Sequence, residues 1–423
     1  MNTPIPQNQP DLSHLLQNQD VQFDLSGSTR FISTGVSDHA IVGFLNWVFP
    51  YAASIKASDI HFSDVENGCA IRLRHQNMKL ERHWLFTRSA GEDVRRLICA
   101  KCKVVSTDSE SIQDGSFFVL DKNRQMMIDI RVNILPTKFG CNIACRILDQ
   151  ANSGRSLDTV DMPSDVRESV LQVLAQEQGM VIVSGPTGSG KTSTLYSFLN
   201  HLNTPDKHIM TAEDPVEYRL PGANQVNVHR HFRPFDKVLR AFLRQDPDII
   251  LVGEIRDNET ANTAVTAANT GHLLLSTIHA NDALSTVIRL IKLGVERFAL
   301  ADALSAFFAQ RLLNKLCPHC REEVRLSTDE QATLKTRFPA EVYYRKGQGC
   351  DECDNTGLSG RIPVMEFVVK SEEVRQAILS DDFARLEQAM LVQPQYKTLV
   401  EAGLLMSGEG LVDFNDAKAL GVR

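Results

Sequence analysis

The sequence predicts an α/β protein whose second half is built on a parallel β-sheet. The first observation is a Gly-rich run that follows an apolar segment and opens a helical pattern: Gly185, Pro186, Thr187, Gly188, Ser189, Gly190, Lys191 and Thr192. The second is that strand-like and helix-like segments alternate after this run, as parallel strands joined by helical crossovers require. A chain of 423 residues is also too long for one ordinary core, because domains average about 150 residues.

The first part of the chain is predicted to hold a tail, a small domain and a linker. Residues 1–37 are polar and show little periodicity, which indicates a tail. Residues 38–150 are predicted to form a smaller mixed α/β domain, with strand patterns at Ile71–Leu73, Phe117–Leu120, Met127–Val132 and Asn142–Leu148. Residues 151–165 contain Gly, Ser, Asn and Pro among charges and are predicted to be a linker.

The strand and helix order of residues 166–300 is typical of a RecA-like P-loop core. The predicted strands are Met180–Ser184, His208–Ala212, Ile249–Val252 and Leu273–Ile278. The predicted helices are Thr192–Leu202, Pro234–Arg244, Glu259–Asn269 and Leu284–Leu293. After Val295 we expect helical structure, with a helical, Cys-bearing module at residues 301–370 and a C-terminal helical region at residues 371–423.

Composition and charge favour a cytoplasmic protein without membrane segments. The longest apolar stretch, Ile41–Ala53, contains Asn46 and Pro50 and is shorter than the roughly 20 residues that a spanning helix needs. The N-terminus lacks the basic start and apolar centre of a secretory signal. With 45 Lys and Arg against 52 Asp and Glu, the net charge of −7 gives no global reason to expect nucleic acid as the main partner.

The Gly-rich run has the pattern of a phosphate-binding loop. Its glycines let backbone N–H groups turn inward around an anion, Lys191 can reach the β- and γ-phosphates, and the Thr192 hydroxyl is placed to ligate Mg²⁺. The alternative is a chance Gly-rich turn, which the flanking strand and helix patterns disfavour. The run therefore predicts binding of ATP with Mg²⁺.

Two acidic residues are predicted to follow separate core strands. Glu254 comes after the apolar run Ile249–Val252, at the end of a parallel strand where ligands bind. A nucleotidase needs a carboxylate there to orient the attacking water, and Gly253 replaces the Asp that usually precedes it. A second acid is therefore needed, and the segment Thr211–Glu217 supplies candidates, with Glu213 paired with Glu254 for catalysis. For either acid alone, a solvated cap or surface ion pair is the alternative.

Two histidines bracket the last predicted core strand. His272 precedes Leu273–Ile278 and His279 follows it. Either histidine could sense or contact the γ-phosphate. The alternative for each is a hydrogen-bonded structural residue, since lone histidines most often have that role.

Two Cys-x-x-Cys pairs predict a metal site. Four thiolates can complete a tetrahedral Zn²⁺ site and staple a small segment that lacks its own core; they are Cys317, Cys320, Cys350 and Cys353. The alternative is four unligated thiols. Cys99 and Cys102 also form a Cys-x-x-Cys pair, but their segment has a helical pattern and no second pair nearby, so buried or partly exposed thiols are expected rather than a metal or redox site. Cys69, Cys141 and Cys145 are expected to be packing residues.

Long motifs in the second half resemble the type II secretion and type IV pilus assembly ATPase family. They are the phosphate-binding loop, TAEDPVEY (Thr211–Tyr218), LRAFLRQDPDIILVGEIRD (Leu239–Asp257) and ETANTAVTAANTGHLLLSTIHANDA (Glu259–Ala283). The resemblance covers most of residues 55–370. It implies that Glu213 and Glu217 belong to the acidic box, that Glu254 is the Walker B glutamate, and that His272 and His279 flank the histidine box.

The resemblance extends to the first domain. The segments Ala57–Phe62, Asp129–Thr137 and Ala144–Leu148 are similar to the PAS-like, nucleotide-facing N-terminal domain of this family. Arg131 and Arg146 match its two phosphate-contacting arginines. From the residues alone, a surface ion pair is the alternative for each. The chain departs from the family pattern at Ser116, where an Arg is usual, and at His75–Gln76, where Asp-Gly is usual, which affects the expected geometry of domain closure.

The residues and the resemblance together predict a cytoplasmic ATPase motor at the inner face of the inner membrane. The resemblance implies a homohexamer that acts on an inner-membrane platform protein with associated cytoplasmic assembly proteins, to assemble a type IV pilus or a type II secretion pseudopilus. Nucleic acid is not an expected partner. The alternatives are a pilus-retraction motor, a conjugation or DNA-translocating motor, and an ATP-binding zinc scaffold without turnover. The Cys module resembles the assembly branch more than the retraction branch.

Overall fold

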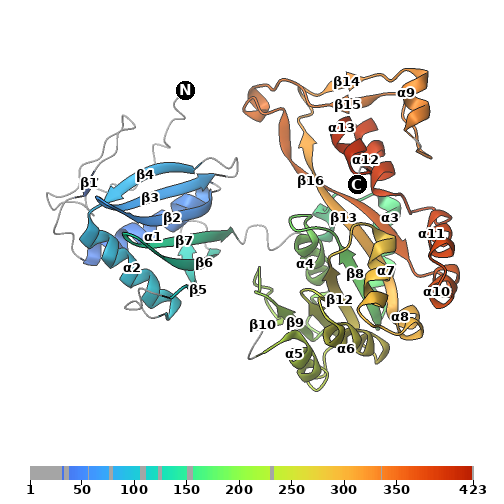
Figure 1. Ribbon diagram of the computed structural model, residues 1–423, viewed down its shortest axis with the longest axis horizontal. Coiled ribbons are helices and arrows are strands. Elements are labelled where there is room, and N and C mark those ends of the chain that lie inside the picture. The colour runs from blue at the N-terminus through green and yellow to red at the C-terminus, as the bar shows by residue number, and fades with distance from the viewer. Residues whose placement is uncertain are drawn as a thin grey trace. The chain divides into compact units, whose positions relative to one another are not determined.

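The computed structural model describes most of the chain as two compact units, residues 1–152 and residues 153–423 (Figure 1). The described residues are 31–32, 38–55, 57–75, 80–104, 111–121, 126–149, 156–228, 233–334 and 336–421. Most of the predicted tail (1–37), the first five residues of the predicted linker and Gln76 lie outside them. Within this described part, no helix combines the length and apolarity needed to cross a bilayer.

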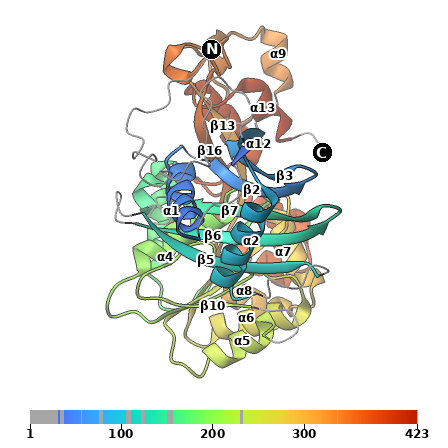
Figure 2. The same cartoon turned by 90° about the vertical axis from the view of Figure 1, so that its left-hand side faces the viewer.

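The first unit is a seven-stranded sheet with helices packed on one face. The strand order is β1 (Phe31–Ile32), β4 (Leu80–Phe86), β3 (Gly68–His75), β2 (Ala57–Val65), β7 (Gly140–Asp149), β6 (Met126–Thr137) and β5 (Gln113–Asp121). Neighbours are antiparallel except for β1 and β4. The helices α1 (Asp38–Ser54) and α2 (Arg88–Cys102) cover the sheet (Figure 2). The predicted strand segments of this domain are therefore confirmed.

Strand alternation decides which side chains of this unit the helices bury. Ile128, Ile130 and Val132 of β6 belong to the core that α1 and α2 cover. Because successive side chains point to opposite faces, Asp129 and Arg131 lie on the other face of the sheet. The cysteines expected to be packing residues, Cys69, Cys141 and Cys145, are buried, and burial raises the pKa of each thiol. Cys99 is buried and Cys102 is half-buried, as expected for that pair.

The second unit is built on a mixed, mostly parallel seven-stranded sheet. Its order is β10 (Asn224–Asn227), β9 (Ile209–Glu213), β11 (Ile249–Val252), β12 (Leu273–Ile278), β8 (Gly179–Ser184), β13 (Leu304–Leu316) and β16 (Leu358–Val369). Only the edge strand β16 runs antiparallel to its neighbour. β8, β11 and β12 are buried along their whole lengths, as parallel strands covered on both faces are.

Helices cover both faces of this sheet. One core cluster joins Val181 and Val183 of β8 to α3 (Ser164–Leu174) and α4 (Lys191–Leu202). The other joins Met180 and Ile182 to a set of helices, namely α5 (Phe235–Phe242), α6 (Asn258–Asn269), α7 (Ala283–Lys292), α8 (Arg297–Ala303), α10 (Glu372–Leu379) and α11 (Phe383–Leu391). The four strands and four helices predicted for residues 166–300 are confirmed.

The helical structure expected for residues 301–370 is wrong for most of that segment. Leu304–Leu316 forms the long strand β13, which pairs with β8 on one side and β16 on the other. Its first seven residues are all buried, so the apolar run shows neither the helical nor the strand period. The run forms a strand because it pairs with the edge of β8 that β12 does not occupy. β13 and β16 therefore extend the core sheet beyond residue 300.

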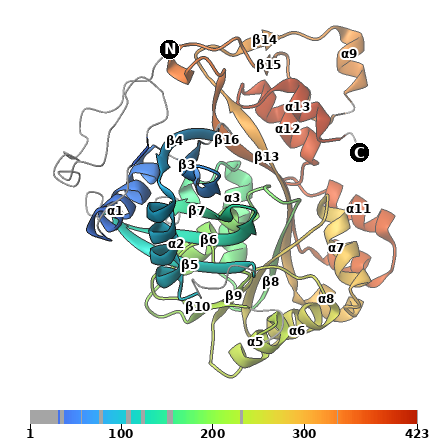
Figure 3. The same ribbon diagram turned by 60° about the vertical axis from the view of Figure 1, so that its left-hand side comes forward.

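The Cys-bearing segment packs on the C-terminal helices. Its elements are β14 (Glu322–Val324), α9 (Thr328–Thr333), β15 (Tyr343–Arg345) and the short 3₁₀ turn Asp351–Cys353. β15 lies beside α12 (Leu399–Gly408) and α13 (Phe414–Ala419), and β14 pairs with β15 (Figure 3). A small core of Tyr343, Leu404 and Phe414 joins the two parts. α10 to α13 agree with the helical expectation for residues 371–423.

Candidate nucleotide site and metal centre

The phosphate-binding loop connects β8 to α4 in the predicted way. Gly185, Gly188 and Gly190 have φ values of 151°, 81° and 85°, which other residues rarely adopt. A Cβ at Gly185 would lie 2.5 Å from the Gln310 carbonyl oxygen, so a side chain there has no space. Gly190 caps α4 without a side-chain hydrogen bond, and this leaves the first N–H groups of the helix for an anion.

Lys191 lies folded over this loop. Its Nζ donates to the carbonyl oxygens of Gly185 at 2.8 Å and Pro186 at 2.9 Å. Burial lowers the pKa of Lys191, the Glu254 carboxylate opposes that shift, and Arg311 adds to it. The ammonium is thus held at the loop, near Glu254, where a phosphate oxygen can replace the carbonyl acceptors.

Glu254 and His279 meet at the carboxyl ends of β11 and β12. The His279 Nε2 lies 3.7 Å from Glu254 Oε2, and Arg256 pairs with the other carboxylate oxygen. The Glu254 side chain is 14% exposed, so it is shielded but reachable. A cavity of about 560 Å³ lies beside them, lined by Gly185, Pro186, Thr187, His279, Ala280, Asn281, Ser285, Ile288, Arg289 and Lys292. The structure thus joins the loop, a carboxylate and a histidine.

Glu213 lies at the same edge of the sheet, but its carboxylate is enclosed. It ends β9, whose Ala212 pairs with Val252 of β11. Tyr196 Oη donates to Glu213 Oε2 at 2.7 Å, and Thr211 Oγ1 donates to Oε1 at 2.6 Å. Burial raises the pKa of Glu213, while these hydrogen bonds oppose the shift. The carboxylate is therefore tied to α4, which carries Tyr196, rather than directed into the described cavity.

The four sulfur atoms of the two Cys-x-x-Cys pairs form one cluster. All lie within 4.8 Å of one another, with Sγ–Sγ distances of 3.8 Å for Cys317–Cys350, 3.8 Å for Cys320–Cys353 and 3.7 Å for Cys350–Cys353. Zinc bound at about 2.3 Å by four thiolates sets the sulfurs about 3.8 Å apart at the corners of a tetrahedron. A disulfide requires about 2.05 Å. The donor set and spacing fit zinc.

Comparison with known families matches residues 35–419 to the family described as "Type II/IV secretion system protein". The chain belongs to this family. The "Type IV pilus assembly ATPase PilB" of Pseudomonas aeruginosa is 39% identical over 394 residues, which are 91% of this chain and 68% of that protein. The "Putative type II secretion system protein E" of Escherichia coli K12 is 37% identical over 377 residues, 87% of this chain and 75% of that protein.

Solved structures place the fold in the same group. The crystal structure of the pilus retraction motor PilT with bound ADP is 25% identical, has a TM-score of 0.68, and matches 90% of this chain and 97% of that one. The ATPase DotB of Legionella pneumophila, at 21% identity, matches in fold with a TM-score of 0.64 over 89% of this chain and 95% of that one. The secretion-family fold therefore spans both units of the chain.

The two predicted histidines, His272 and His279, lie at opposite ends of β12. His272 is beside Leu273, which pairs with Gly179 at the start of β8, whereas the phosphate loop follows the end of β8. Six strand residues, about 20 Å, separate these ends. His272 Nδ1 instead lies 2.9 Å from the Ala267 carbonyl oxygen. The expected γ-phosphate contact is thus not met by His272 within its own chain, because the strand between the histidines spans the sheet.

The two arginines of the first unit are cross-strand neighbours. Arg131 of β6 pairs in register with Arg146 of β7, so both lie on the sheet face that α1 and α2 leave uncovered. Asp59 on β2, the next strand, accepts from Arg146 Nε at 3.2 Å. The Arg146 side chain is 69% exposed. The pair thus presents two guanidinium groups together, and Asp59 orients one of them.

Gln310 is a residue of this site that the sequence motifs do not reveal. It is on β13 and is 1% exposed. Its Nε2 donates to the Ser189 carbonyl oxygen at 2.7 Å, and its Oε1 accepts from Thr194 Oγ1 at 2.9 Å. Gln310 therefore fastens the phosphate loop to the first turns of α4. Its neighbours in sequence look like a buried helix, so only the pairing of β13 with β8 identifies it.

Proposed function

We propose that this chain is the ATPase that powers assembly of a type IV pilus or of a type II secretion pseudopilus, from the cytoplasmic face of the inner membrane. The observation that carries the proposal is a cavity lined by the phosphate loop and His279, with Glu254 in contact with that histidine, in a chain of the secretion family. The relatives described as PilB and as type II secretion protein E support the two systems named.

Each residue of the site takes a distinct part in hydrolysis. The loop amides and Lys191 bind the phosphates, and Thr192 holds Mg²⁺, which when bound neutralises phosphate charge. Glu254 orients the attacking water, and His279 beside it supports that carboxylate or contacts the γ-phosphate. Glu213 and Glu217 of the acidic box shape the loop after β9. We assign His272 a structural part, at the turn between α6 and β12.

The motor acts as a homohexamer on an inner-membrane platform protein with associated cytoplasmic assembly proteins, and nucleic acid is not a partner. Family resemblance and the charge balance support this. The proposed domains keep the expected PAS-like unit at residues 38–150 and the C-terminal region at residues 371–423. The RecA-like core begins with α3 and continues past residue 300 through β13 and β16, so the proposed zinc module is the Cys-bearing segment between these two strands. The four-Cys cluster favours the assembly branch over retraction.

Purified full-length chain should hydrolyse ATP only when Mg²⁺ is present, and double-stranded DNA should leave the rate unchanged. A colorimetric phosphate assay with and without EDTA, and with and without DNA, measures both. Strong stimulation by DNA would favour a DNA-translocating motor instead. Binding of ATP with no release of phosphate would favour a scaffold without turnover.

Replacing Arg131 or Arg146 by Ala should reduce turnover about 100-fold or more, because their guanidinium groups are proposed to close over the γ-phosphate. ADP affinity should stay within about threefold of wild type, since ADP lacks that phosphate. Initial rates and titration with a fluorescent ADP analogue measure the two effects. Asn133→Ala, two residues from Arg131 on the same sheet face, is the matched control. Equal losses of ADP binding and turnover would assign the arginines to folding.

A further inference from the structure

Helix α7 forms one wall of the candidate nucleotide cavity. Ser285, Ile288, Arg289 and Lys292 line the cavity, and their spacing of three or four residues places them on one face of the helix. The position of α7 therefore sets the distance between these side chains and the phosphate loop across the cavity. The contacts that hold the start of α7 in place are therefore important for nucleotide binding.

The start of α7 is held by two carboxylates. Asp282, the N-cap residue, accepts from Ser285 N at 2.6 Å. Glu366 Oε2 accepts from Ala283 N, the first N–H of the helix, at 2.6 Å. Glu366 comes from the edge strand β16 and is 4% exposed. Such charge-assisted bonds at a helix N-terminus are strong, because the N–H groups there carry partial positive charge.

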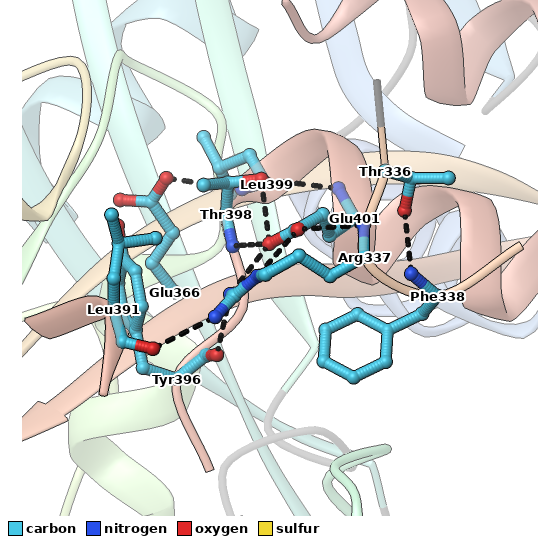
Figure 4. Close-up of polar contacts among 9 residues, drawn as sticks. All are labelled: Thr336, Arg337, Phe338, Glu366, Leu391, Tyr396, Thr398, Leu399 and Glu401. Carbon is cyan, nitrogen blue, oxygen red and sulfur yellow. Dashed lines mark hydrogen bonds and ion pairs between the residues drawn. The ribbon is translucent and has the colours of Figure 1, made fainter. Parts of the chain in front are cut away.

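The same carboxylate also holds the start of α12. Glu366 Oε1 accepts from Leu399 N, the first residue of that helix, at 3.0 Å (Figure 4). α12 belongs to the C-terminal region that packs on the Cys-bearing segment. One buried side chain thus bonds the first N–H of the cavity wall and the first N–H of a helix outside the cavity.

A second contact holds α12 without touching α7. Arg337, after α9, donates from Nε to Glu401 Oε1 at 2.8 Å and from Nη2 to Glu401 Oε2 at 2.8 Å. It also donates to the carbonyl oxygens of Leu391 and Tyr396 (Figure 4). Arg337 therefore secures the start of α12 and the end of α11 without bonding the first N–H of α7, and it provides a control for loss of stability in the C-terminal region.

We propose that Glu366 is a positioning residue for ATP turnover, which joins the wall of the nucleotide cavity to the C-terminal region through the two helix starts. A movement of α12 is then passed to α7, and a change at the cavity is passed to α12. The inference rests on the proposed function, because it requires that this cavity binds nucleotide.

The test compares Glu366→Gln with Arg337→Gln in the full-length chain. The amide introduced by Glu366→Gln keeps one acceptor oxygen, but its NH₂ group faces a backbone N–H that it cannot bond. Glu366→Gln should raise the KM for ATP several-fold, up to about 10-fold, with a smaller change in kcat. Arg337→Gln should lower the Tm and leave KM unchanged. Both are measured with initial rates, titration with a fluorescent ATP analogue, and thermal unfolding.

A second variant serves if Glu366→Gln does not fold. Ala283→Pro removes the N–H that bonds Glu366 and keeps the carboxylate. Proline is favoured at the first helical position. Asp282 before it is extended, with φ −150° and ψ 174°, and so avoids the helical region that is disfavoured before proline. It should raise KM in the same way. Unchanged KM in folded Glu366→Gln or Ala283→Pro, or an equal KM shift in Arg337→Gln, overturns the inference. A wild-type chain that binds no ATP analogue overturns the proposed function itself.

Discussion

Replacing Glu254 by Gln should reduce ATP turnover by about 100-fold or more while ATP binding is retained. The carboxylate lies beside His279 and close enough to Lys191 to oppose the lowering of its pKa. The amide has nearly the same shape but cannot accept a proton or attract water as strongly. Single-turnover phosphate release and titration with a fluorescent ATP analogue separate turnover from binding.

Glu259→Gln is the matched control for this variant. Glu259 is an exposed acid in the first turn of α6, only five positions further along the chain. It should retain wild-type turnover and affinity. A Glu254→Gln chain that hydrolyses ATP at the wild-type rate would show that another group orients the water.

Replacing Cys350 by Ser should release zinc and unfold the Cys-bearing segment before the P-loop core. Purified wild-type chain should contain one zinc per chain, measured by mass spectrometry of the metal. The segment has only a small apolar core with α12 and α13, so the ion supplies much of its stability; structural zinc sites contribute about 10–16 kcal/mol in small peptides. Thermal unfolding of Cys350→Ser should show an early transition that wild type lacks.

Cys102→Ser is the control for zinc loss, because Cys102 belongs to a Cys-x-x-Cys pair outside the four-sulfur cluster. It should keep the full zinc content. Folded wild-type chain without metal, or Cys350→Ser with wild-type zinc content, would contradict the structural role of the ion.

The sequence could predict those parts of the site that lie within one short segment. The loop from Gly185 to Thr192 takes its form from its own glycines and from the strand and helix on either side. Glu254 lies two residues after the last residue of an apolar strand. Because parallel strands end at the same edge of the sheet, its place beside the loop also follows from local pattern. The four cysteines form two Cys-x-x-Cys pairs, a common zinc-ligand pattern. The two cysteines of each pair are close in sequence, so the only long-range contact that the site needs is the approach of one pair to the other.

The sequence by itself therefore determined the α/β class, the positions of four core strands along the chain, the phosphate loop, the carboxylate of Glu254 near that loop and the four-Cys cluster. Only the tertiary structure decided that the run beginning at Leu304 is a strand, that Gln310 holds the phosphate loop, that His272 is far from it, and that Glu366 joins two helix starts. The physical reason is the separation along the sequence between the residues that make each contact. A motif encodes contacts between residues that are near in sequence, whereas these four results depend on which distant segments complete a sheet edge or accept a buried N–H.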